Sequence, residues 1–140
     1  MNRIFLVLLS FSITAVSFSQ SEDWALYKSV EGVEIYTQEV ECLENKLPDQ
    51  TAFILKVVNT TNKNLQIEWD LAIWYNGKLV TGTEPIEENH HLVTIEKNQT
   101  VIGDCATPRG PLYIIKGFKA ASSKTKLTKF EFQNIQVSKS

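Results

Sequence analysis

The sequence predicts an all-β protein that folds as a single antiparallel β-sandwich of about eight strands. Apolar and polar side chains alternate with a period of two over most of residues 20–140, and no stretch keeps the 3.6-residue period of an amphipathic helix. Polar turn clusters recur at short intervals, at 31–32, 59–64, 97–99 and 120–126. Short strands without helices between them favour a sandwich over a closed barrel, and an immunoglobulin-like topology is compatible with this pattern.

The clearest strand spans residues 65–75. Its odd positions are large and apolar and its even positions are mostly polar, so one face belongs to a core and the other to solvent. Asn76-Gly77 follows at once, and this pair supplies the positive φ angles of a two-residue type I′ turn. We therefore expect a hairpin that returns through residues 78–81.

The same reasoning predicts the other strands, at 25–30, 33–40, 51–58, 91–96, 100–103, 112–118 and 127–137. Residues 51–58 are apolar on both faces, which is typical of a strand in the middle of a sheet. In the last strand the apolar parity changes after Phe132 and resumes at Ile135. This change predicts a β-bulge near Gln133-Asn134.

Residues 1–19 have the composition of a secretory signal peptide. Arg3 precedes an apolar run, and a small-x-small cleavage site ends at Ser19, so the mature chain is expected to start at Gln20. A membrane anchor is the alternative, but the run is shorter than the roughly 20 residues of a spanning helix. We expect a secreted or periplasmic protein with no membrane span in the mature chain.

The mature chain has two cysteines, Cys42 and Cys105, and export favours a disulfide bond between them. Closing a loop of this length contributes roughly 4 kcal/mol in the chain-entropy description. Two buried free thiols, or a reactive thiol at Cys105, are the alternatives. Trp69 follows Cys42 by 27 residues, which departs from the spacing of antibody domains.

The charge of the chain argues against a nucleic-acid-binding protein, because 14 basic and 16 acidic residues give a net charge of −2 at pH 7. The basic residues are concentrated at the end: residues 105–140 carry seven of them and one acidic residue. Lys116 and Lys119 belong to this region, as members of a binding patch or of a solvated face that keeps sheet edges soluble.

Three stretches resemble small exported proteins of Bacteroidota-type bacteria that have no assigned function. They are residues 24–42 (WALYKSVEGVEIYTQEVEC), 57–80 (VVNTTNKNLQIEWDLAIWYNGKLV) and 127–137 (LTKFEFQNIQV). The resemblance covers most of the mature chain. It implies export and no particular activity.

Metal-ligating residue types cluster in one region, at Glu84, Glu87, Glu88, His90 and His91. Adjacent histidines on a strand point to opposite faces, so a polar loop that leads into a strand is favoured over a metal site. The sequence has no G-x-S-x-G elbow, P-loop or H-E-x-x-H motif. We therefore expect no cofactor and no enzyme activity.

The polar side of the strand at 65–75 is the best candidate for a binding surface. Glu68, Asp70 and Trp74 share its parity, and an indole that faces solvent offers an anchor for a protein or a carbohydrate. Parity places Trp74 on the exposed side unless another part of the chain covers it.

These observations lead to three hypotheses. The first is a non-catalytic β-sandwich that binds a protein or glycan surface. The second is a carrier whose small-molecule or lipid ligand lies between the sheets, lined by Phe53, Leu55, Trp69 and Ile73. The third is a thiol or metal enzyme that uses Cys105, or His90 and His91.

Overall fold

The computed structural model describes residues 23–43, 49–81, 89–107, 110–120 and 122–140, and the expected signal peptide lies outside these ranges. Within them the chain forms nine strands and no α-helix, and hence no helix long and apolar enough to cross a membrane. The strands are β1 (Ala25–Val30), β2 (Val33–Cys42), β3 (Gln50–Asn59), β4 (Leu65–Tyr75), β5 (Lys78–Thr81), β6 (His90–Ile95), β7 (Thr100–Ile102), β8 (Tyr113–Phe118) and β9 (Leu127–Lys139).

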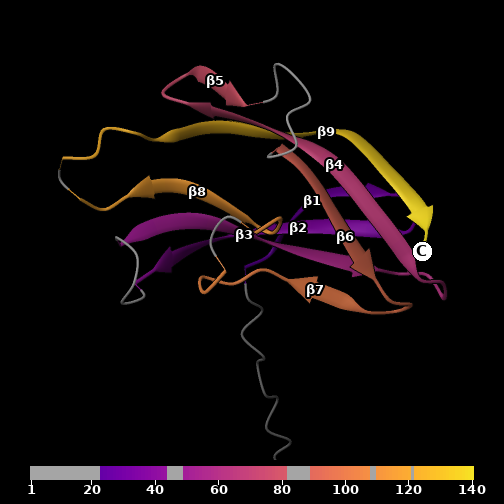
Figure 1. Cartoon of the computed structure of the whole chain (residues 1–140). Helices are drawn as coiled ribbons and strands as arrows, with labels where there is room; N and C mark the ends of the chain where they lie inside the picture. The colour runs from indigo at the N-terminus through magenta and orange to yellow at the C-terminus, as the bar shows by residue number, and fades with distance from the viewer. Residues whose placement is uncertain (1–22, 44–48, 82–88, 108–109, 121) are drawn as a thin grey trace, which may run out of the picture.

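Two antiparallel sheets face each other, so the expected β-sandwich is confirmed (Figure 1). In the first sheet β1, β2 and β3 lie in order, and β7 and β8 share the remaining edge of β3. In the second sheet β9 pairs with one edge of β4, and β5 and β6 share the other edge. Each sheet therefore completes one edge with two short strands placed end to end.

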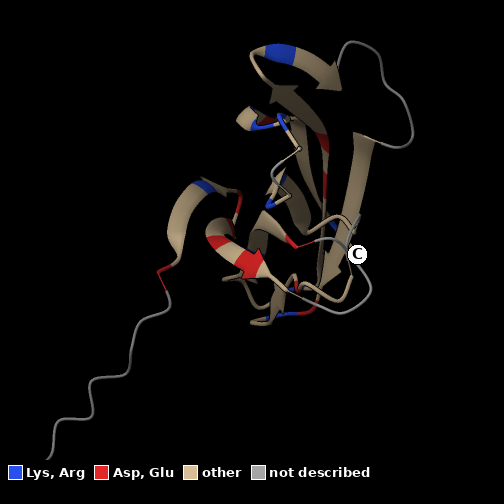
Figure 2. Cartoon of the chain, turned by 90° about the vertical axis from the view of Figure 1, so that its left-hand side faces the viewer, with Lys and Arg blue, Asp and Glu red and all other residues tan. Residues whose placement is uncertain are grey.

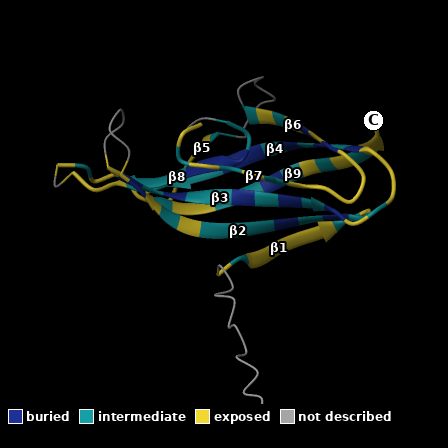
Figure 3. Cartoon of the chain, turned by 90° about the horizontal axis from the view of Figure 1, so that it is seen from below, coloured by how far each residue is buried: buried dark blue, intermediate teal, exposed yellow. Residues whose placement is uncertain are grey.

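The core lies between the sheets and consists of the inward side chains of both. Its buried residues occur on strands of both sheets (Figure 3). Trp69 of β4 is at its centre with none of its surface exposed, and its ring centroid lies 5.3 Å from that of Phe132 in β9. Burying an aliphatic or aromatic side chain of this kind stabilises a fold by roughly 1.5–3 kcal/mol. The buried members are Val33, Ile35, Leu55, Val57, Leu65, Ile67, Trp69, Leu71, Val93, Ile95, Leu112, Ile114 and Phe132.

The local predictions for the hairpin and the bulge are confirmed. Asn76 and Gly77 have φ angles of 49° and 77°, and β5 returns beside β4 as the type I′ turn requires. In β9 the register against β4 shifts between the partners of Glu68 and Asp70, and Asn134 there has a φ of 51°. Because the bulge adds one residue to β9, apolar side chains of this strand point toward the core both before and after it.

A second, smaller apolar cluster lies on the outer face of the first sheet. Cys42, Ala52 and Tyr113 are buried there, on β2, β3 and β8. Cys105, in the connection from β7 to β8, packs on this cluster and forms the expected disulfide bond with Cys42. The bond therefore ties a covering segment to one sheet, whereas the disulfide of antibody domains joins two sheets.

Tyr27 closes the edge of the sandwich where β1 and β9 meet. The pairing of β1 with β2 is irregular between Leu26 and Lys28, and the ring of Tyr27 lies 4.8 Å from that of Phe132. The Tyr27 hydroxyl accepts a hydrogen bond of 3.3 Å from the backbone N–H of Phe132. The Tyr27 side chain thus satisfies the Phe132 N–H, which would otherwise be open to pairing with an added strand.

Candidate functional site

The outer side of the second sheet carries most of the predicted binding residues. We call it the β4 face, and it comprises the outward residues of β4 together with their neighbours on β5, β6 and β9. Strand register places Leu92 opposite Glu68 and His90 opposite Asp70 on β6. On the other flank, Lys129 of β9 lies opposite Trp74. Because paired residues share a face, these side chains form one continuous surface.

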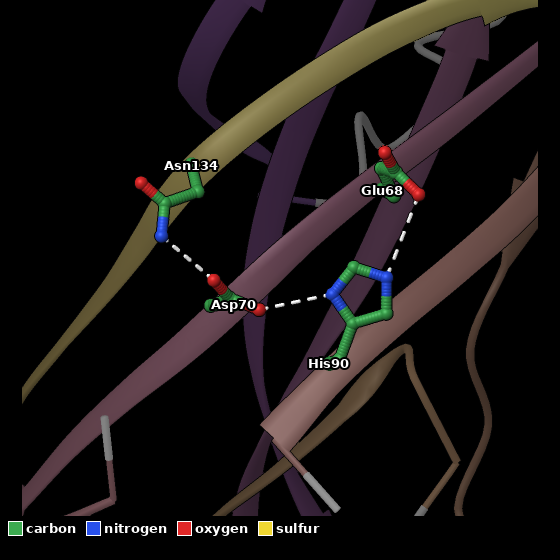
Figure 4. A network of polar contacts seen from close by, with 4 residues as sticks. All are labelled: Glu68, Asp70, His90 and Asn134. Atoms are coloured by element: carbon green, nitrogen blue, oxygen red, sulfur yellow. Dashed lines mark hydrogen bonds and ion pairs between the residues drawn. The ribbon is translucent and has the colours of Figure 1, made fainter. Parts of the chain in front are cut away.

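A polar network at the centre of the β4 face joins three strands (Figure 4). Asp70 Oδ1 lies 2.9 Å from His90 Nδ1, and Asp70 Oδ2 accepts a hydrogen bond of 2.7 Å from Asn134 Nδ2. The second ring nitrogen, His90 Nε2, lies 3.5 Å from Glu68 Oε2. The carboxylates are therefore held by β6 on one side and by the bulge of β9 on the other.

The network stabilises the charged forms of Asp70 and His90. The hydrogen bond from Asn134, followed by that from His90, lowers the pKa of Asp70. The hydrogen bond to Asp70 raises the pKa of His90, and the charge of Glu68 acts in the same direction. Glu68 and Asp70 keep part of their side chains exposed, so a ligand can reach two ordered carboxylates.

Trp74 is half-buried, so another part of the chain covers it, the alternative that parity left open. Lys129 covers it: Nζ lies 4.6 Å from the ring centroid, and the same ammonium forms an ion pair of 2.6 Å with Glu131. Ala72, on the same side of β4, is fully buried. The parity argument placed both residues on the correct side of the strand, but it could not include side chains from β9.

Exposed apolar side chains border the network. Leu92 is 47% exposed next to Glu68, and Leu79 is 38% exposed next to Trp74. The β4 face thus combines ordered carboxylates with accessible hydrocarbon.

Lys116 and Lys119 are not part of the β4 face. Both belong to the first sheet or the turn after it, where Lys116 Nζ lies 2.6 Å from Glu39 and Lys119 Nζ lies 2.7 Å from Glu41. The structure therefore separates the five predicted binding residues into a group of three on β4 and two lysines elsewhere.

The metal and thiol hypotheses gain no geometric support. His90 and His91 point to opposite faces, and His91 packs toward Trp69, where burial lowers its pKa. Glu87 lies outside the described residues, and the described ones contain no group of three metal-ligating side chains. Cys105 is bonded to Cys42, so neither has a free thiol.

The residues that would line a ligand between the sheets pack in the main core instead. Leu55 and Trp69 are fully buried members of it, and Phe53 and Ile73 pack against it. Trp69 Nε1 is buried without a hydrogen-bond partner among the described residues.

Asn134 is the one member of the network that sequence reasoning did not single out. Its signal was the parity change in residues 127–137, which predicted the bulge without indicating where the amide would point. The geometry thus places ordered carboxylates beside exposed apolar side chains on the β4 face. No family model, curated protein or solved structure matches the chain.

Proposed function

We propose that the chain is a secreted or periplasmic binding module, released after residue 19, that recognises a partner protein through the β4 face. The observation that carries the proposal is the polar network of Glu68, Asp70, His90 and Asn134. Its side chains are held in place by bonds between three strands, so binding would cost little side-chain entropy.

The composition of the face favours a protein with basic groups over a glycan. Lys129 occupies the face of the Trp74 indole, so the ring is not free to stack on a sugar. Exposed Leu92 and Leu79 instead offer apolar contacts beside two carboxylates. Protein interfaces combine such apolar anchors with complementary charge around them. A glycan, bound through the carboxylates and amides, is the second candidate.

The chemistry of the network supports binding rather than catalysis. His90 bonds to two carboxylates, and no hydroxyl or thiol of the described residues lies within hydrogen-bonding distance of its ring. An imidazole with a carboxylate activates a nucleophile only when one is within reach. The module is therefore proposed to act by recognition alone.

Binding through the β4 face is tested by charge reversal at Glu68. The exported protein, its Glu68→Lys variant and a Glu41→Lys control on the first sheet are immobilised and exposed to the extracellular or periplasmic fraction of the producing cells. The recovered partner is then purified and its affinity measured. We expect Glu68→Lys to weaken binding by about tenfold or more, and Glu41→Lys to bind like the unmodified protein.

Protease and glycosidase treatment of the fraction separates the two partner classes. Loss of binding after protease treatment supports a protein, and loss only after glycosidase treatment supports a glycan. Equal binding by Glu68→Lys and the unmodified protein would reject the β4 face.

A further inference from the structure

A groove of about 300 Å³ opens at one end of the sandwich, away from the β4 face. It lies between the ends of β2, β3 and β8 and the connection that leads into β9, at the end that faces the viewer in Figure 2. Its lining includes Glu39, Thr51, Lys116, Phe118, Thr125 and Lys126. The volume is at the lower end of the range for ligand pockets, so the occupant is small.

The groove carries an excess of positive charge. Lys116 is neutralised by Glu39, and its ammonium lies 5.7 Å from the ring centroid of Phe53, which forms the adjoining end of the core. Lys126 has no carboxylate of the described residues within ion-pair distance. One ammonium thus remains uncompensated among the charged lining residues, and the surrounding segment is the basic part of the sequence. The net positive charge of the groove lining favours an anionic ligand.

The uncharged lining matches a ligand with hydroxyl groups. Thr51, Ser123 and Thr125 supply hydroxyls that donate and accept, while Phe118 and Leu127 supply apolar surface for C–H groups. We propose that this groove binds a small hydroxylated carboxylate, of the size and chemistry of a sugar acid. Its carboxylate pairs with Lys126 and Lys116, and its hydroxyls bond to the threonine and serine side chains. This site is independent of the β4 face and goes beyond the proposed function.

The test titrates the exported protein with sodium galacturonate as the probe, and with glucose and sodium acetate as controls. Binding is detected by NMR from changes in the amide chemical shifts. Galacturonate is expected to produce saturable shifts of the Gly117 and Thr125 amides, with acetate and glucose binding more weakly. Lys126→Gln is expected to weaken binding by about two- to fivefold, as for one exposed ion pair. Glu39→Gln is expected to strengthen it by a similar factor, because it frees Lys116 and removes a repulsive charge.

Lys124→Gln is the matched control, since it removes a charge from the same connection outside the groove lining. Absence of saturable shifts with galacturonate overturns the proposal. Equal binding by acetate would show that the hydroxyls contribute nothing, and weaker galacturonate binding in Glu39→Gln would show that the Glu39 carboxylate supports binding instead of competing with the ligand for Lys116. Each of these results contradicts a sugar-acid site, and none depends on the partner of the β4 face.

Discussion

The outer faces of the two sheets differ in how their side chains are held in place. On the first sheet, the connection between β7 and β8 lies over Ala52 and Tyr113 and is fixed by the Cys42–Cys105 bond. On the second sheet, His90 and Leu92 remain exposed on the β4 face, and its polar groups are ordered by bonds between neighbouring strands. A covered face contributes to stability, whereas an uncovered face with ordered polar groups is suited to binding a partner.

Removal of the disulfide should have the largest effect on the covered face. Replacing Cys42 and Cys105 by alanine is expected to lower the free energy of unfolding by roughly 4 kcal/mol, because the unfolded chain loses a cross-link between residues 63 apart. Urea denaturation followed by tryptophan fluorescence measures the change. The His90 pKa on the opposite sheet should be unaltered. A loss below about 1 kcal/mol would show that the covering segment is held without the bond.

A smaller loss is expected for Tyr113→Phe. The Tyr113 hydroxyl accepts a hydrogen bond of 2.6 Å from Gln50 Nε2, and both residues are buried. Phenylalanine leaves that amide without a partner, which costs about 1–3 kcal/mol. Tyr36→Phe is the control, because the Tyr36 hydroxyl donates to Glu34 in a more exposed position. Equal denaturation midpoints for the two variants would contradict the expected cost of leaving the buried Gln50 amide without a partner.

On the open face, Asp70→Asn should change titration more than stability. The asparagine removes the negative charge and leaves a neutral amide oxygen as the acceptor in place of a carboxylate, so the His90 pKa is expected to fall toward its ordinary value. NMR of the imidazole resonances during a pH titration measures it. Glu131→Gln, which removes a carboxylate on β9 that pairs with Lys129, should leave the His90 titration unchanged. An unaltered titration in Asp70→Asn would mean that the network does not form in solution.

The smallest effect concerns the dependence of stability on pH. Because the folded-state pKa of His90 is raised above its ordinary value of 6.5, its contribution is complete below that value and is lost as pH rises through the folded-state pKa. Unfolding free energies of the protein and of His90→Gln should therefore differ more at about pH 5.5 than at about pH 8.5. A larger difference at the higher pH would reverse the sign and reject the bond to Asp70.

The fold was predictable because its signals are local. The alternation of Leu65, Ile67 and Trp69 and the Asn76-Gly77 pair follow directly from strand and turn geometry, and both were confirmed. The contact of Tyr27 with Phe130 and Phe132 was not predictable, since it depends on a register irregularity in β1 that leaves no parity change in a six-residue strand.

The site was predictable only along one strand. Parity placed Glu68, Asp70 and Trp74 on the same side of β4, but Asn134 and Lys129 come from β9, whose register is set by long-range pairing. The same limit applies to Lys116 and Lys119, which pair with Glu39 and Glu41 of the first sheet. Charge along the sequence does not say which sheet a residue joins.

We propose that the β4 face binds a partner and that the first sheet does not. A photo-crosslinking amino acid introduced at Leu92, which is exposed beside Glu68, tests it in the producing cells. The same residue at Ile102, exposed on β7 of the first sheet, is the comparison. We predict a discrete crosslinked species from position 92 that Glu68→Lys abolishes. Crosslinking from position 102 alone, or a species at position 92 that persists in Glu68→Lys, would contradict the claim.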